Sequence, residues 1–366
     1  MTLVSIVGDF HSSILPIIYE HKDRLTQHIL LYKGLSRDTK MAQQLSAGIN
    51  SFKDKYSYTF TNKEYLLKDD TLEDLYTCAQ DLVAQAKDPQ ELYINITDGL
   101  ANITTVLTYM LFGQGVRFLS YDMYENTQTL MDTKRYEKSF LQEKMSIVDH
   151  FLLKGFEMEQ SAIKEFAKEN KELITLLIEK HHRHYNQFLG VDPRSVKYIQ
   201  DLPDKHSLIR DIFCKYGFGK YMLKDPRLTG NIFESYIYNL LRDLDYDDIE
   251  IGFKVFATYK NSRIANEFDI LIMKNNHLHM IECKYLNRIK LEDLIYKYTA
   301  LANTLDHDGK MIIVMKKKPL YSKRIDLHEN KGLIYKRGIL NNIKVFGDVK
   351  EDPQAFVQKV KKEFEI

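Results

Sequence analysis

Short apolar runs and stretches with helical periodicity alternate through the first 122 residues. The runs that predict strands are Leu3–Val7, Ile29–Tyr32, Tyr58–Thr61, Leu92–Ile96 and Val116–Tyr121. Between them, Leu72–Ala86 repeats apolar residues every three or four positions, and Met41–Phe52 and Ile103–Phe112 also favour helices. Strands that alternate with helices are typical of a parallel sheet with helices on both faces. We therefore expect an α/β, Rossmann-like domain over residues 1–135.

The pattern changes after this domain. Ser139–Phe151, Glu157–Ala167 and Glu172–Phe188 are strongly charged and have helical periodicity. We expect a helical linker over residues 136–226 that also carries dimer contacts.

The last part of the chain, residues 227–366, shows a fixed order of predicted elements. A helix is followed by three strands, a second helix and a fourth strand, which together predict a compact α/β core. In that order the segments are Gly230–Arg242, Ile249–Tyr259, Ile264–Met273, His277–Lys284, Leu291–Leu305 and Met311–Met315.

Acidic residues and a lysine fall inside the second and third of these strands. Residues i and i+2 of a strand point to the same face, so Glu282 and Lys284 project together while Cys283 points away. Asp269 lies far enough before Glu282 for two antiparallel strands joined by a turn at Asn275–Asn276. Two carboxylates beside one amine are costly to bury unless they hold a metal or each other.

This order, with Glu234 on the first helix, Asp269 on the second strand and Glu282-x-Lys284 on the third, closely resembles the PD-(D/E)xK nuclease superfamily over Thr229–Met315. A structural ion pair is the alternative, because an isolated Glu-x-Lys occurs by chance in most proteins. The order of the elements favours the catalytic interpretation.

The chemistry of phosphodiester cleavage suits these residue types. Hard oxygen ligands bind Mg²⁺ or Mn²⁺, which neutralises the phosphate and activates water. We expect Asp269 and Glu282 to be metal ligands, with the backbone carbonyl of Cys283 as a third. Lys284 would position or deprotonate the attacking water, and Glu234 would help a second metal or a metal-bound water.

Two loops of the first domain directly follow predicted strands. The first loop is Gly8–Ser13, after Leu3–Val7, and the second is Thr97–Asn102, after Leu92–Ile96. In an open parallel sheet, ligands bind beyond the carboxyl ends of the strands, and hydroxyls, a glycine and a helix N-terminus suit a phosphate. For the first loop the alternative is an ordinary strand-to-helix turn with Ser12 as an N-cap. The candidate ligand-binding residues are Asp9, Phe10, His11, Ser12, Ser13, Thr97, Asp98, Gly99 and Asn102.

The segment Asn95-Ile96-Thr97-Asp98-Gly99 resembles the second ligand motif, N-x-T-G-G-T-K, of the CARF (CRISPR-associated Rossmann fold) domain. Asp98 replaces a glycine of that motif, Leu100 a threonine and Ala101 the lysine. A CARF domain joined to a PD-(D/E)xK core resembles the CRISPR ancillary nucleases. That resemblance implies a homodimer whose two CARF domains share one cyclic oligoadenylate, most often cyclic tetra-adenylate.

Composition sets limits on partners and location. The formal net charge of +1 requires nucleic-acid contacts to come from local patches. One such candidate, Lys316-Lys317-Lys318, is either a solvated loop or a phosphate-tracking run. The three cysteines form no CxxC or zinc pattern, and the first apolar run is too short for a signal peptide. We expect a cytoplasmic protein without a membrane span.

Three functional hypotheses follow. The first is a metal-dependent endonuclease with little sequence preference, acting on DNA or RNA and activated by a cyclic oligoadenylate in type III CRISPR antiviral defence. The second is a restriction or repair nuclease without such a sensor. The third is a nucleotide-binding regulator with an inactive nuclease fold, which the presence of Glu234, Asp269, Glu282 and Lys284 argues against.

Overall fold

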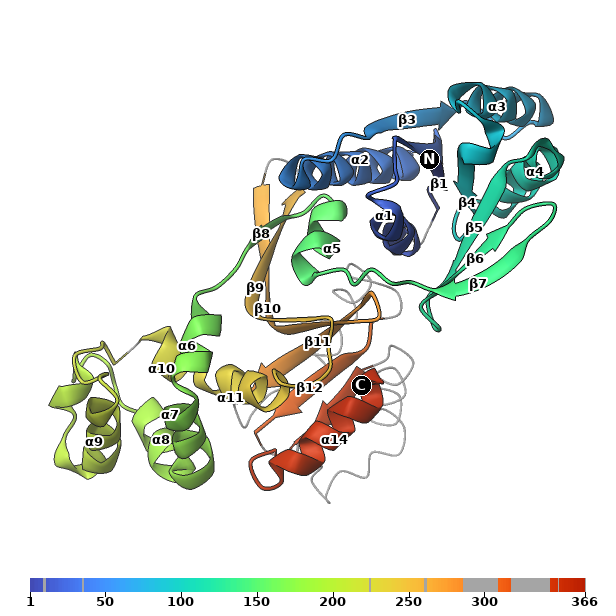
Figure 1. Ribbon diagram of the computed structural model, residues 1–366. Helices are drawn as coiled ribbons and strands as arrows, with labels where there is room; N and C mark the ends of the chain where they lie inside the picture. Colours follow the sequence, from blue (N-terminus) through green and yellow to red (C-terminus); the bar gives the residue numbers. More distant parts are fainter. Residues whose placement is uncertain are drawn as a thin grey trace, which may run out of the picture. The chain divides into compact units, whose positions relative to one another are not determined.

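The chain forms two compact units (Figure 1). The computed structural model describes residues 1–8, 11–34, 36–223, 225–259, 262–285, 309–316, 343–347 and 349–365. The first unit consists of Met1–Met158, Val255–Ile264 and Asn275–His277. The second consists of Glu159–Lys254, Ala265–Lys274 and Leu278–Ile366.

A seven-stranded sheet with the order β3-β2-β1-β4-β5-β6-β7 forms the centre of the first unit. The first five strands of the chain pair in parallel, whereas β6 and β7 add an antiparallel edge. This confirms the expected parallel α/β sheet. The strands are β1 (Thr2–Ile6), β2 (Gln27–Lys33), β3 (Thr61–Leu67), β4 (Leu92–Asn95), β5 (Arg117–Asp122), β6 (Thr127–Met131) and β7 (Tyr136–Phe140).

Helices cover both faces of this sheet. Leu3 packs in one core cluster with residues of α1 and α2, whereas its neighbour Val4 packs in a second cluster with residues of α3 and α4. The alternation of β1 side chains therefore separates the two helical layers. The helices are α1 (Leu15–His21), α2 (Ser36–Tyr56), α3 (Leu72–Gln85), α4 (Ala101–Leu111) and α5 (Ile147–Leu153), with short helical turns η1 (His11–Ile14), η2 (Pro89–Glu91) and η3 (Phe112–Gln114).

A buried polar ladder crosses three strands of the sheet. His28 on β2 lies between Ser5 on β1 and Asn62 on β3, with 3.0 Å from Nε2 to Ser5 Oγ and 2.9 Å from Nδ1 to Asn62 Oδ1. An amide oxygen only accepts, so Nδ1 carries the proton and Nε2 accepts from the serine. Burial lowers the pKa of His28 to about 4, and the neutral ring satisfies both neighbours.

The turn between β10 and β11 belongs to the first unit. Asn276 is buried there: its Oδ1 accepts from Met145 N at 2.8 Å, and its Nδ2 donates to Asn126 Oδ1 and Glu143 O, each at 3.2 Å. Asn126 Oδ1 also accepts from the hydroxyl of Tyr121 at 3.2 Å. Both residues of the turn have positive φ, 51° at Asn275 and 61° at Asn276.

A six-stranded sheet with the order β13-β12-β11-β10-β9-β8 carries the second half of the chain. β11, β12 and β13 pair in parallel. The strands are β8 (Glu157–Glu159), β9 (Asp248–Tyr259), β10 (Ser262–Lys274), β11 (His277–Lys284), β12 (Met311–Met315) and β13 (Ile343–Phe346). The helices are α6 (Ile163–Glu169), α7 (Lys171–Thr175), the π-helical turn η4 (Leu176–Lys180), α8 (His182–Leu189), η5 (Ile199–Asp201), η6 (Asp204–His206), α9 (Ser207–Lys215), α10 (Pro226–Thr229), α11 (Ile232–Leu241) and α14 (Pro353–Phe364).

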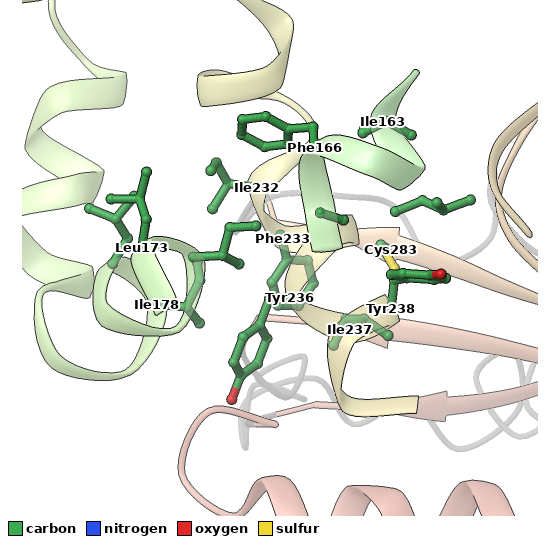
Figure 2. Packing of buried hydrophobic residues seen from close by; sticks show 14 of the residues in the cluster. Ile163, Phe166, Leu173, Ile178, Ile232, Phe233, Tyr236, Ile237, Tyr238 and Cys283 are labelled. Carbon is green, nitrogen blue, oxygen red and sulfur yellow. The ribbon is translucent and has the colours of Figure 1, made fainter. Parts of the chain in front are cut away.

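The core of the second unit joins α11 and α14 to one face of the sheet. Figure 2 shows the part of this core in which side chains of α6 and α11 lie near Cys283 of β11. Alternate strand residues, such as Ile281 and Cys283 on β11, belong to the same cluster as Phe233 and Ile237 on α11. Because side chains alternate along a strand, Glu282 and Lys284 point to the other face of β11. The core thus fixes the orientation of the two polar residues.

The strands predicted at Ile249–Tyr259, Ile264–Met273, His277–Lys284 and Met311–Met315 are confirmed. The helix predicted at Leu291–Leu305 lies outside the described residues. Two predicted helices are wrong in part: Ser139–Phe151 holds the end of β7 and then α5, and Glu157–Ala167 holds β8 and then α6.

These errors have physical causes. All five residues of β7 are exposed, so this edge strand has no buried face and no apolar alternation to reveal it. The third strand begins at Thr61, later than the predicted Tyr58–Thr61, because Tyr58 stacks on Phe52 of α2. Within the described part of the chain, no helix is long and apolar enough to span a membrane.

Candidate active site and ligand-binding loops

The structure brings three of the predicted catalytic side chains together on adjacent strands. Asp269 on β10 accepts a hydrogen bond at Oδ2 from the backbone N–H of Cys283 on β11, at 2.7 Å. The ammonium of Lys284 contacts the carboxylate of Glu282 and lies 3.7 Å from Asp269 Oδ2. The two-residue turn and the alternation of side chains along β11 produce this arrangement.

Glu234 lies in the first turn of α11. The charges of Asp269 and Lys284 both affect the pKa of its carboxyl group. Burial, and after it the negative charge of Asp269, raise the pKa of Glu234 to about 8, although the positive charge of Lys284 acts in the opposite direction. Asn231 donates from Nδ2 to Glu234 Oε2 at 3.2 Å. Sequence reasoning missed Asn231, although its position three residues before Glu234 places both on one helix face.

Carboxylate oxygens are the ligand type that hard divalent cations prefer. Asp269, Glu282 and Glu234 offer carboxylate oxygens, and the repulsion between Glu234 and Asp269 is what a bound cation relieves. In this structure Lys284 supplies the positive charge between Asp269 and Glu282. Among the described residues, no group of three or more His, Cys, Asp or Glu side chains converges as a ready metal site.

The thiol of Cys283 faces the core of the second unit, as Figure 2 shows. Burial raises the pKa of this thiol well above its usual value. A buried, neutral thiol behaves as a small hydrophobic side chain. The predicted contribution of Cys283 to a metal site is therefore limited to its backbone carbonyl.

A second cluster of polar side chains lies at the end of β11, and the sequence analysis did not predict it. Lys316 is buried at the end of β12, where its backbone N–H donates to Lys284 O at 3.0 Å. Its ammonium donates to Asn186 Oδ1 on α8 and lies 4.1 Å from the ring centre of Tyr285. Tyr285 also donates to Asn186 Oδ1, at 2.8 Å. Lys317 and Lys318, the rest of the predicted basic run, lie outside the described residues.

The two candidate ligand loops of the first unit meet at the carboxyl ends of β1 and β4. A Cβ atom added at Gly8 would lie 2.5 Å from both Asp98 Oδ1 and Gly99 N, so a side chain there would clash. Gly99 itself has a φ of 107°, a conformation that favours glycine. Glycines at these two positions allow the loops to approach each other.

Internal hydrogen bonds hold several of the predicted ligand residues. Thr97 Oγ1 accepts from Tyr121 N at 2.8 Å, and Asn102 Nδ2 donates to Asp70 Oδ2 at 2.6 Å. Ser13 and Asp98 are buried. His11 and Ser12 lie in η1, with side chains that the structure does not describe, and Asp9 and Phe10 fall outside the described residues.

One segment in the second half of the chain matches a known domain family. Residues 224–319 match the family model of the Card1-like endonuclease domain. This segment contains Glu234, Asp269, Glu282 and Lys284, and the match agrees with the predicted resemblance to CRISPR ancillary nucleases. No curated protein matches the sequence.

Three solved structures share the fold. Protein VC1899 from Vibrio cholerae superposes with a TM-score of 0.77 at 14% identity, covering 100% of this chain and 98% of that one. Can2 from Sulfobacillus thermosulfidooxidans, in complex with cyclic tetra-adenylate, gives 0.69 at 16% identity, with 99% of each chain covered. A type III CRISPR defence DNA nuclease activated by cyclic oligoadenylate gives 0.52 at 13% identity, covering 87% of this chain and 45% of that one. The predicted two-domain α/β architecture is confirmed.

Proposed function

We propose that this protein is a divalent-metal-dependent endonuclease that a cyclic oligoadenylate activates in type III CRISPR defence. The observation that carries the proposal is the position of Lys284 between Asp269 and Glu282, within a segment that matches the Card1-like endonuclease domain. The full-length likeness to Can2, solved with cyclic tetra-adenylate, supports the activator.

Each residue of the site has a chemical role in this proposal. Asp269 and Glu282 hold Mg²⁺ or Mn²⁺ through their carboxylate oxygens, with the Cys283 carbonyl as a further ligand. The bound ion supplies neutralisation of the phosphate charge and a lower pKa for water. Lys284 orients the attacking water or stabilises the charge that develops on the phosphate oxygens. Glu234 holds a second ion or an ordered water, and Asn231 fixes its carboxylate.

The first unit is the sensor in this proposal. The loops that meet at Gly8 and Asp98 lie beyond the carboxyl ends of adjacent parallel strands, where open α/β sheets bind ligands. A homodimer would place two copies of these loops around one symmetric ring. The activator must bind the active state more tightly than the idle one, because equal affinity for both would leave the equilibrium between the two states unchanged.

The test is a cleavage assay with plasmid DNA, labelled single-stranded DNA and labelled single-stranded RNA. Each substrate is incubated with Mg²⁺ or Mn²⁺, with and without a panel of cyclic oligoadenylates. We expect cleavage that requires both the metal and one ring size. Equal cleavage without any ring would favour a restriction-type nuclease, and ring binding without cleavage would favour an inactive regulator.

A further inference from the structure

The two ligand loops contain no lysine or arginine. Gly8–Ser13 and Thr97–Asn102 contribute two aspartates, Asp9 and Asp98, and no basic side chain other than His11. A cyclic oligoadenylate carries one negative charge on each phosphodiester, so the aspartates of these loops have charge of the same sign as the ring. A cation from a neighbouring element would offset this repulsion and strengthen the binding of the ring.

Lys33 lies on a neighbouring element that can supply such a cation. β2 pairs in parallel with β1, and Val7 N donates to Leu31 O at 2.8 Å, so the end of β2 runs beside the start of the Gly8 loop. Lys33 is the last residue of β2. Its position at the carboxyl end of this strand is the one from which parallel sheets contact ligands.

One carboxylate connects Lys33 to the second loop. The ammonium of Lys33 lies 2.9 Å from Asp70 Oδ1, and Asn102 Nδ2 lies 2.6 Å from Asp70 Oδ2. The side chains of Lys33 and Asp70 are 22% and 29% exposed, so both reach solvent. The hydrogen bond from Lys33, followed by that from Asn102, lowers the pKa of Asp70 to about 2, so this carboxylate is ionised at neutral pH.

We propose that Lys33 binds a phosphate of the activator and that Asp70 is the anion which the phosphate displaces. The inference rests on the proposed function, because it takes the ligand to be a cyclic oligoadenylate. In the free protein Asp70 holds Lys33 and Asn102 and neutralises the lysine. On binding, a phosphate oxygen takes the place of one carboxylate oxygen, and the lysine keeps a charge-assisted hydrogen bond.

The proposed role and a purely structural salt bridge predict opposite effects on ligand affinity when Asp70 is removed. If the Lys33–Asp70 pair served only to hold the loops, removal of either partner would weaken ligand binding by loosening the same contact. If Asp70 competes with the phosphate, its removal frees Lys33 and reduces the negative charge near the ring. The two substitutions then change affinity in opposite directions.

The experiment compares Lys33→Met with Asp70→Asn in the full-length protein. Titration calorimetry with cyclic tetra-adenylate, and with the other rings of the panel, measures the affinity of each variant. We expect Lys33→Met to weaken binding by about tenfold, the effect of losing one charge-assisted hydrogen bond. Asp70→Asn should tighten binding several-fold. Lys63→Met on β3 and Asp54→Asn on α2 are matched controls, because both residues are exposed and change charge by the same amount.

The outcomes separate the inference from the function on which it rests. Weaker binding by both Lys33→Met and Asp70→Asn, or an unchanged affinity in Lys33→Met, would overturn the role of Lys33. A failure of the wild-type protein to bind any ring would overturn the proposed activator, and the inference with it. A gain of affinity in Asp70→Asn cannot arise from misfolding, so that variant keeps the test decisive if Lys33→Met is unstable.

Discussion

The carboxylate of Asp269 accepts a hydrogen bond from the backbone N–H of Cys283, with 2.7 Å between Oδ2 and N. This bond fixes the carboxylate of β10 beside the Glu282–Lys284 stretch of β11. It also means that Asp269 has both a structural and a proposed chemical role. An asparagine retains an oxygen that accepts from Cys283 N, whereas an alanine does not.

The first prediction uses this distinction. Asp269→Asn should fold normally and lose cleavage by about 10²–10⁴-fold, because the charge that holds the metal is removed while the acceptor remains. Asp269→Ala should also lower the unfolding midpoint. Cleavage assays with Mg²⁺ and thermal unfolding measure the two effects. Asp245→Asn, at an exposed carboxylate of the same unit, is the control. Near-normal cleavage by Asp269→Asn would show that the proposed ligand is wrong.

Lys284 gives a second prediction. Lys284→Met should keep divalent-metal binding and lose most turnover, because the amine acts on the water or the phosphate and not on the ion. Removing the ammonium also leaves Asp269 and Glu282 without their shared counter-charge, which favours a cation in its place. Calorimetry with Mn²⁺ and a cleavage assay check both parts. Loss of metal binding together with activity would contradict the assigned role.

The buried ladder at His28 gives a prediction about pH. The folded pKa of about 4 lies below the ordinary value of 6.5, so the unfolded chain binds a proton that the folded chain does not. Stability should therefore fall as pH decreases from 6.5 towards 4, by about 3 kcal/mol from this residue. Urea unfolding of wild type and His28→Gln at a series of pH values measures the difference. Identical pH slopes for both proteins would show that His28 is not responsible.

The turn at Asn275–Asn276 offers a matched pair of substitutions. Both residues have positive φ, so glycine adopts either position without strain. Asn276→Gly removes the acceptor of the buried Met145 N–H and should destabilise the protein by about 1–3 kcal/mol. Asn275 is exposed, and Asn275→Gly should have a much smaller effect. Chemical denaturation and hydrogen exchange at Met145 distinguish them, and equal destabilisation would contradict the role of Asn276.

Local rules account for what the sequence predicted correctly. The alternation of side chains in β11 and the short turn before it sufficed to place Asp269, Glu282 and Lys284 together. The rule for parallel sheets likewise predicted that the loops at Gly8 and Asp98 lie beyond the carboxyl ends of their strands, and the structure adds that these two strands are neighbours. In each case the relevant residues lie on elements that are adjacent in the sheet.

The missed features depend on contacts that periodicity does not encode. Lys316 donates a hydrogen bond to Asn186, which lies 130 residues earlier in the sequence. Nothing in the local sequence around either residue predicts this contact. Lys33, Asp70 and Asn102 come from three separate elements and share one carboxylate. The roles of Asp269, Glu282 and the ligand loops, and the domain boundaries at residues 135 and 226, stay predictions.

The Asn275–His277 turn belongs to the first unit although it lies late in the chain. This limits how the two units can be separated or exchanged in fragments and chimeras. Because this turn and Val255–Ile264 interrupt the second unit along the chain, no single cut separates the two units into complete halves. A fragment that begins at Glu159 would carry Asn276 without Met145, Glu143 or Asn126. A chimera that exchanges the amino-terminal half for that of a relative would have to transplant the turn with it. Two short segments, Val255–Ile264 and Asn275–His277, would therefore have to be exchanged together with the amino-terminal half.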